Sequence, residues 1–262
     1  MKITTKSMEV AGRTLTLEAG RFAVQALSSV LASYGETSVL AVVTTGTENH
    51  GKDYFPLSVE YQERLYAGGR IKGSRWVKRE GRPTEAETLS ARLIDRSIRP
   101  LFPKNYRREV QVVIMVLSVD VDNDPDTLAC IAASAALAIS PIPWNGPIST
   151  ARIGLEEGKL VPHPKNGNRG GVDLDLVVSS TSDLINMIET GARQVPEETI
   201  LAGFELGFKE NKKTIDLINS LVKEVGQKKE TVKNNLPPPE LVKDIRKKGQ
   251  EAINQYISDA AH

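Results

Sequence analysis

The sequence has one cysteine, three histidines and few aromatic side chains among its 262 residues. The lone cysteine, Cys130, excludes an internal disulfide and a cysteine-based zinc site, and three histidines leave little for a histidine-rich metal centre. No apolar run approaches the roughly eighteen residues needed to span a bilayer, and none follows the N-terminal lysines. We therefore expect a cytoplasmic protein with no membrane partner in a reducing compartment.

The chain also lacks an excess of either charge. The 34 Lys and Arg balance 33 Asp and Glu to a net charge of +1, so global charge indicates neither a nucleic-acid nor a membrane partner. Between Arg64 and Arg108, however, thirteen Lys or Arg accompany four Asp or Glu, which concentrates a net charge of +9 in this segment. A signal for an anionic partner must therefore be sought there.

The first half of the chain is expected to combine strands with one clearly bounded helix. Residue alternation and β-branched runs predict strands at residues 10–18, 39–45, 58–61 and 110–121, with a helix at residues 23–32 between the first two. After Pro83, Thr84 and Glu87 form the pattern of a capping box, which predicts a helix that ends near Ile98.

An alanine-rich helix and a second group of strands are expected next. Residues 128–139 are largely alanine, so another element can approach this helix closely and we expect it to be buried. Asp126 or Thr127 can cap it. The pattern predicts strands at residues 149–155, 160–162 and 173–179 and a helix at residues 197–209, whereas residues 182–190 fit either a strand or a helix.

The composition shifts near residue 211. Residues 212–232 and 239–257 are lysine-rich amphipathic stretches separated by a run of prolines. We expect a core at residues 1–211, with an N-terminal part to about residue 145 and a C-terminal part at residues 146–211. A partial α-helical domain at residues 212–262 is expected to follow.

The basic segment places cations around an aromatic side chain. In its glycine-bearing loop at residues 70–83, Trp76 is followed by Lys78, Arg79 and Arg82. Cations neutralise phosphates and a ring offers a stacking face to any base, so this loop suits single-stranded nucleic acid.

A second basic surface is expected on the helix that follows this loop. Arg92, Arg96 and Arg99 recur at i, i+4 and i+7, which places them on one helix face. Asp95 can pair with Arg92 and Arg99, so this face fits a salt-bridged or solvated surface as well. Trp76 also fits a residue of a satellite hydrophobic core. Because a basic loop and a basic helix face can border one groove, we favour nucleic-acid binding.

Other polar residues are weaker candidates. Four aspartates alternate at residues 120–126, but the glycine and glutamate of a calcium loop are missing, which favours a turn and a helix cap. Asp173 and Asp175 lie two apart on a predicted strand and fit either a magnesium site or an ordinary sheet edge. His50 and His163 have no nucleophile or acidic partner nearby in sequence, which favours polar loop residues.

Four long motifs are too specific to be chance matches. They are FPLSVEY at residues 55–61, YAGGRI at 66–71, KREGRPTE at 78–85 and RLIDRSIRPLFP at 92–103, supported by YGET at 34–37, IPWNGPI at 142–148 and ETGA at 189–192. With these motifs the chain resembles the bacterial polynucleotide phosphorylase family over essentially its whole length. The resemblance implies an α+β ribonuclease PH-like core, of the type of ribosomal protein S5 domain 2, followed by a small all-α domain.

The resemblance also implies an activity. Family members are nucleotidyltransferases that degrade mRNA from the 3′ end by phosphorolysis, with Mg²⁺, and release nucleoside diphosphates. They carry two such cores, form a ring-shaped trimer, and hold the phosphate and metal site in the second core. This chain matches the first core, so we expect it to bind and channel single-stranded RNA within a homotrimer. Inorganic phosphate, nucleoside diphosphates and Mg²⁺ are expected only in the full enzyme, and no catalytic or metal-binding residue in this chain.

Departures from the family pattern support this expectation. Where active cores resemble a Gly-Ser or Gly-Thr-Arg signature at a helix start, this chain has residues 123–127, Asn-Asp-Pro-Asp-Thr, whose carboxylates repel phosphate and whose proline has no N–H to donate. Asp173 matches one aspartate of the family's pair, but position 167, where the other belongs, is glycine.

The loop match is partial as well. Residues Trp76 to Arg79 match a loop that resembles the family's RNA constriction, usually two aromatics followed by two arginines. Val77 removes one stacking face, and Lys78 replaces the planar fork of an arginine with a point charge. The resemblance therefore implies a cationic loop with a reduced aromatic gate.

Two other functions fit the same residues. One is an RNA-binding or assembly module with no role in phosphorolysis. The other is a self-sufficient ribonuclease PH-like exonuclease that works through Asp173 and neighbouring arginines. Phosphate-dependent release of nucleoside diphosphate by this chain alone distinguishes the self-sufficient exonuclease from the expected non-catalytic core.

Overall fold

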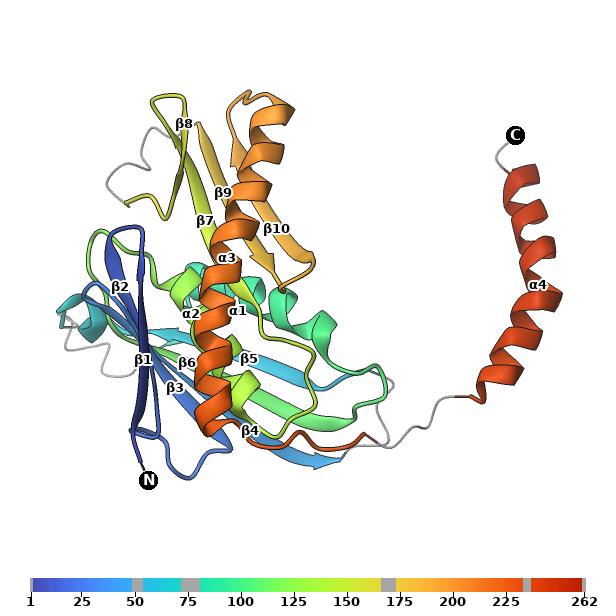
Figure 1. The fold of residues 1–262 in the computed structure, drawn as a ribbon, viewed down its shortest axis with the longest axis horizontal. Helices are drawn as coiled ribbons and strands as arrows, with labels where there is room; N and C mark the ends of the chain where they lie inside the picture. The colour runs from blue at the N-terminus through green and yellow to red at the C-terminus, as the bar shows by residue number, and fades with distance from the viewer. Residues whose placement is uncertain (1, 49–53, 72–80, 166–172, 233–236, 261–262) are drawn as a thin grey trace. The chain divides into compact units, whose positions relative to one another are not determined.

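The first half of the chain folds into a six-stranded mixed sheet in the computed structural model, which describes residues 2–48, 54–71, 81–165, 173–232 and 237–260. The strands are β1 (Thr4–Val10), β2 (Arg13–Ala19), β3 (Ser28–Tyr34), β4 (Thr37–Glu48), β5 (Leu57–Glu63) and β6 (Arg108–Ser118). They lie in the order β1-β2-β3-β4-β6-β5, and only β5 and β6 are parallel (Figure 1). The connection between this parallel pair holds the short helix η1 (Leu65–Gly68), α1 (Glu85–Ile98) and η2 (Arg99–Leu101).

A second sheet is antiparallel and four-stranded. It contains β7 (Ser149–Glu156), β8 (Lys159–Pro162), β9 (Leu174–Ser180) and β10 (Ile185–Ala192), in the order β10-β9-β7-β8. The ambiguous segment at residues 182–190 is therefore largely a strand. The helix α3 (Glu197–Val225) packs against β7 and β9, with Gly203 and Gly207 facing Leu176 and Val178. A Cβ atom at Gly203 would lie 2.7 Å from a methyl of Leu176, so the helix approaches the sheet closely.

The alanine-rich helix α2 (Pro125–Ile139) is buried, as predicted. It contacts β3 and β4 of the first sheet and β7 of the second, and its central residues from Leu128 onward are almost without exposed surface. Its N-cap is Asp124, with Pro125 in the first helical position, so the predicted cap at Asp126 or Thr127 is wrong. Proline fits the first turn because its missing N–H has no partner there.

The predicted helix at residues 23–32 is wrong, because residues 28–34 form β3. Val30 and Ala32 are fully buried, and β3 is paired on both sides, with β2 and β4. Gly35, at a φ of +60°, makes a two-residue turn in which Tyr34 faces Thr37. This strand pairing outweighs local helix propensity, and the chain opens with antiparallel strands, of which β1 was not predicted.

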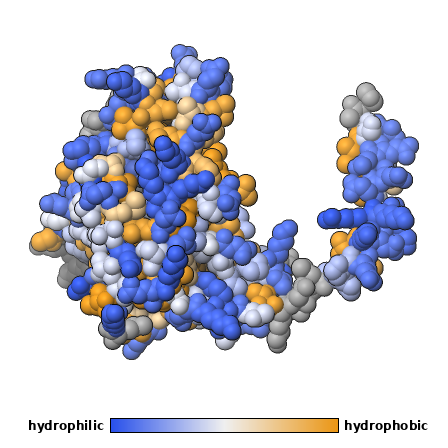
Figure 2. Space-filling view, in the orientation of Figure 1, coloured by the Kyte–Doolittle hydropathy of each residue, from blue (hydrophilic) through white to orange (hydrophobic). Residues whose placement is uncertain are grey.

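The C-terminal part divides differently from the sequence pattern. α3 continues to Val225, so residues 197–209 and most of residues 212–232 form one helix, and the expected core boundary at residue 211 lies inside it. The chain splits into two compact units, Met1–Glu230 and Thr231–His262, and α4 (Pro239–Ala260) belongs to the second. Both hydrophilic and hydrophobic side chains lie on the surface of α4 (Figure 2), among them exposed Ile245 and Ile253.

The two sheets and their helices confirm the predicted α+β class. In the part of the chain that the structure describes, none of the helices is long and apolar enough to cross a membrane.

Candidate RNA-binding surface and the start of helix α2

Helix α1, which carries the predicted RNA-binding arginines, begins at a complete capping box. The Thr84 hydroxyl accepts a hydrogen bond from the Glu87 N–H at 3.2 Å, and the Glu87 carboxylate accepts one from the Thr84 N–H at 2.7 Å. The same carboxylate accepts the N–H of Glu63 at 2.8 Å, which joins the start of α1 to the end of β5. Burial opposes ionisation of Glu87, but these N–H donors hold its pKa below the usual value. The helix start is thus fixed as predicted.

Arg99 at the other end of α1 is held within the protein. Its guanidinium pairs with Asp95, at 2.6 Å from Nη2 and 2.8 Å from Nε, and it donates to the carbonyls of Phe55 and Leu57 at 3.2 and 3.1 Å. These bonds join the end of α1 to the start of β5. They give Arg99 a structural role, and its contact with RNA stays a prediction.

Arg92 and Arg96 lie on the exposed face of the same helix. Both side chains are exposed, and neither forms an ion pair with any residue in the described ranges. Asp95, the expected competitor, binds Arg99 instead. Arg82, just before the capping box, is exposed as well. Trp76, Lys78 and Arg79 lie outside the described residues.

The short helix η1 and the residues directly after it hold two candidates that the sequence analysis did not single out. Tyr66 is 57% exposed, and Arg70 follows it on the surface. The segment is anchored, because the N–H of Arg70 donates to the Leu65 carbonyl and the N–H of Val119 donates to the Ala67 carbonyl. An aromatic ring followed four residues later by a cation, both within the motif YAGGRI, was the signal available in the sequence.

The start of α2 is occupied by carboxylates of the chain itself. Asp124 is the N-cap, Pro125 has no N–H, and Asp126 lies in the first turn. Arg152 on β7 pairs with Asp126, and its Nη2 lies 3.8 Å from Asp124. The positive end of a helix commonly binds phosphate, but these negative side chains repel it. That this helix start holds no phosphate stays a prediction.

Asp173 and Asp175, which in the sequence fit either a magnesium site or an ordinary sheet edge, have different contacts in the structure. Asp175 accepts two hydrogen bonds from Nη1 of Arg152, at 2.9 and 2.8 Å, whereas Asp173 precedes β9 and its carbonyl accepts the N–H of Arg193. Across the described residues, no three His, Cys, Asp or Glu side chains are gathered closely enough to hold a metal ion.

The aspartates at residues 120–126 form a turn and the N-terminal cap of α2, which the sequence pattern favoured over a calcium loop. Asp120 accepts hydrogen bonds from the N–H of Glu36, the N–H of Asp122 and the side-chain amide of Asn123. Burial opposes its charge, but these donors lower the pKa of Asp120. Asp122 pairs with Lys165 at 2.8 Å.

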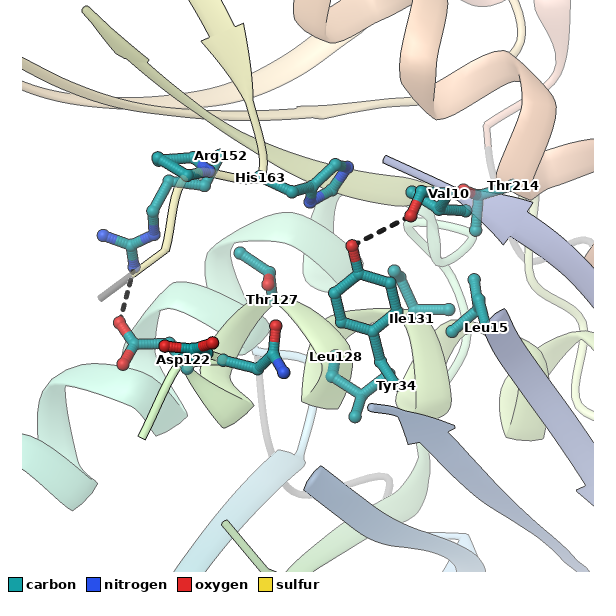
Figure 3. A pocket seen from close by; sticks show the side chains of 13 residues that line it. Val10, Leu15, Tyr34, Asp122, Thr127, Leu128, Ile131, Arg152, His163 and Thr214 are labelled. Atoms are coloured by element: carbon teal, nitrogen blue, oxygen red, sulfur yellow. Dashed lines mark hydrogen bonds and ion pairs between the residues drawn. The ribbon is translucent and has the colours of Figure 1, made fainter. Parts of the chain in front are cut away.

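A pocket lies beside the start of α2. It is lined by Val10, Leu15, Tyr34, Asp122, Asn123, Asp124, Thr127, Leu128, Ile131, Arg152, His163, Pro164 and Thr214. His163 lies between Arg152 and Tyr34 in Figure 3, and its ring centre is 6.2 Å from that of Tyr34. Burial lowers the pKa of His163 to about 4, so its imidazole is neutral near pH 7. His163 follows β8 in a loop, as favoured from the sequence, and it lines this pocket, whereas His50 lies outside the described residues.

Comparisons with known proteins agree with this fold. Residues 11–143 match the family described as 3′ exoribonuclease family, domain 1, and residues 146–210 match domain 2 of the same family. A protein named polyribonucleotide nucleotidyltransferase from Roseiflexus castenholzii is 46% identical over 98% of this chain and 34% of its own length. One of the same name from Heliobacterium modesticaldum is 46% identical over 97% of this chain and 35% of its own length.

This chain thus spans about a third of the length of the curated relatives it matches. The fold is also similar to the crystal structure of rice (Oryza sativa) Rrp46. The match covers 79% of this chain and 94% of the rice chain, with a TM-score of 0.64. Its sequence identity of 16% supports a shared fold alone.

Proposed function

The chain belongs to the 3′ exoribonuclease family, and on this premise we propose that it is the RNA-binding core of a polyribonucleotide nucleotidyltransferase. The full enzyme degrades mRNA from the 3′ end by phosphorolysis and releases nucleoside diphosphates. This core binds and channels the single strand and does not cleave it alone. The names of the relatives support phosphorolysis as the reaction. The arrangement of charged residues supports a core that binds RNA while another part of the full enzyme cleaves it.

The observation that carries the proposal is the exposure of Arg92 and Arg96 on a rigid helix. Their charges are not used in ion pairs within the described part of the chain, so they are available to phosphates. The capping box at one end of α1 and Arg99 at the other fix the helix against β5. In the sequence, Lys78, Arg79 and Arg82 precede α1 and extend the same positively charged segment, which we propose to lie along the RNA path of a trimeric full enzyme.

The start of α2 supports the absence of chemistry in this core. Phosphate, which attacks the terminal phosphodiester, needs amide or cationic partners, whereas Asp124 and Asp126 present negative charge here. Arg152 does not compensate, because Asp126 and Asp175 already bind it. In the proposal, phosphate and Mg²⁺ act on a part of the full enzyme outside this chain.

Removal of the two exposed arginines tests the binding role. We expect the double variant Arg92→Ala, Arg96→Ala to bind a single-stranded oligoribonucleotide more weakly. Its slope of log affinity against log salt should fall by about 1.4, the value for two lost phosphate contacts on a single strand. Affinity is measured by fluorescence anisotropy at several salt concentrations.

The matched control removes the same charge from elements other than α1. Lys159 on β8 and Lys223 on α3 are exposed lysines, and the variant Lys159→Ala, Lys223→Ala is expected to keep the wild-type salt slope. An equal loss of RNA affinity in both double variants would show that the effect comes from net charge rather than from the positions of Arg92 and Arg96. Unchanged binding of the arginine variant would contradict the proposal.

A further inference from the structure

Arg152 lies at the centre of a carboxylate cluster built from two elements. Asp124 and Asp126 come from the start of α2, and Asp175 comes from β9. Nη1 of Arg152 binds both oxygens of Asp175, and Nη2 binds Asp126 and lies within 3.8 Å of Asp124. The residue is only 8% exposed, and its buried Nε has no hydrogen-bond partner in the described structure.

The guanidinium of Arg152 is shared by the carboxylates of Asp126 and Asp175, and it lies close to that of Asp124. The side chains of Asp124, Asp126 and Asp175 are 31%, 17% and 44% exposed, so water screens part of their mutual repulsion and the buried guanidinium offsets the rest. Burial opposes the charge of Arg152, but Asp126 and Asp175 raise the pKa of its guanidinium above the usual value. Arg152 is therefore a permanent positive charge at this point.

Carboxylate oxygens, such as those of Asp124, Asp126 and Asp175, are the ligands that a divalent cation prefers. In the arrangement that Arg152 imposes, however, they do not fit a divalent cation. Mg²⁺ requires oxygens at about 2.0–2.1 Å in an octahedron. The fork of Arg152 instead holds Asp175 on one amino group and Asp126 on the other, which keeps the two carboxylates apart. The residues at the start of α2 therefore do not fit a divalent cation while Arg152 is in place.

We propose that Arg152 is a built-in substitute for a divalent cation. It fills the place among Asp124, Asp126 and Asp175, excludes Mg²⁺ from this core and makes the fold of the core independent of metal. The inference concerns the start of α2 and holds whether or not Arg92 and Arg96 bind RNA.

The proposal predicts that a divalent cation replaces a missing guanidinium. In Arg152→Ala the three carboxylates lose their cation and gain space. Mn²⁺, a probe with the same oxygen preference as Mg²⁺, should then stabilise the variant. We expect millimolar Mn²⁺ to raise its unfolding midpoint by about 5 °C above a NaCl control of equal ionic strength. The additional change Asp175→Asn should remove most of this rise.

Two measurements keep the test independent of the stability of Arg152→Ala. The wild-type midpoint should not respond to Mn²⁺ beyond the NaCl control, and its Mn²⁺ electron paramagnetic resonance signal should remain that of free ion. Arg152→Lys, which retains a positive charge, should also be insensitive to Mn²⁺. If Arg152→Ala is unfolded without metal, recovery of its far-ultraviolet circular dichroism in Mn²⁺ is the expected result.

Several outcomes would overturn the inference. Wild-type protein that binds Mn²⁺, with affinity reduced about tenfold by Asp175→Asn, would show that the carboxylates hold metal despite Arg152. Arg152→Ala that gains nothing from Mn²⁺, or stays unfolded in it, would show that Arg152 does not occupy a cation site. Equal Mn²⁺ stabilisation of Arg152→Lys and Arg152→Ala would show that charge at this position does not exclude metal.

Discussion

Asp95 accepts two hydrogen bonds from the guanidinium of Arg99, one helical turn further along α1. Arg99 also reaches the carbonyls of Phe55 and Leu57, whereas Arg92, one turn in the other direction, is left exposed. The basic stripe therefore has two parts. Its C-terminal arginine holds the helix to β5, and the two preceding arginines face solvent.

This division predicts different effects of two similar substitutions. Arg99→Ala removes an ion pair and two bonds to backbone carbonyls, so it should lower the free energy of unfolding by about 1–2 kcal/mol. Arg92→Ala removes no such contact and should change it by less than about 0.5 kcal/mol. Urea unfolding followed by circular dichroism measures both. Equal destabilisation would contradict the assigned roles.

The capping box is expected to contribute measurably to stability. Thr84→Ala removes the hydroxyl that accepts the N–H of Glu87, and it should cost about 1 kcal/mol. Thr88→Ala is the matched control, because the Thr88 hydroxyl binds only the carbonyl of Thr84 within the helix. A thermal melt of each variant compares them, and a larger loss in Thr88→Ala would argue against the role of the box.

Acid should destabilise the protein through His163. Burial lowers the pKa of this imidazole to about 4, below its usual 6.5, so the unfolded chain takes up a proton first as the pH falls. The free energy of unfolding should therefore decrease between pH 6.5 and 4, by up to about 3 kcal/mol from this group. His163→Asn suits the left-handed backbone at this position, where φ is +52°.

The variant should lose this part of the pH dependence. Urea unfolding at pH 7 and pH 5 measures the difference between wild type and His163→Asn. The same loss of stability in both proteins on acidification would show that other groups, rather than His163, carry the acid sensitivity.

The loop before α1 is expected to share in strand binding. Lys78→Ala with Arg79→Ala removes two cations next to Trp76, so single-stranded RNA should bind more weakly and with a flatter salt dependence. Filter binding across a salt series measures both quantities. An affinity and a salt slope equal to those of the wild type would show that Lys78 and Arg79 do not contact the RNA.

The sequence predicted well those features that depend on residues close together in the chain. Thr84 and Glu87 lie three apart and cap α1 together, and the alanine-rich body of α2 is buried between the sheets as expected. In both cases the stabilising contacts depend on residue spacing along one helix or on side-chain size. Such features are readable in the sequence without knowledge of the fold.

Features that depend on distant partners were missed. A helix was predicted at residues 23–32, but pairing with β2 and β4 makes residues 28–34 a strand. The binding of Arg152 to Asp126 and Asp175 joins residues 26 and 23 positions away and has no local signature. The choice of Asp95 between Arg92 and Arg99 was also open in the sequence, because both lie within reach on one helix face.

The central claim is that this chain binds an RNA strand and carries out no phosphorolysis by itself. The most direct measurement incubates the purified chain with a labelled oligoribonucleotide, Mg²⁺ and inorganic phosphate, and follows strand binding and nucleoside diphosphate release in the same samples. We predict binding that depends on Arg92 and Arg96, with no phosphate-dependent nucleoside diphosphate. Release that requires phosphate and increases in proportion to the chain would contradict the account.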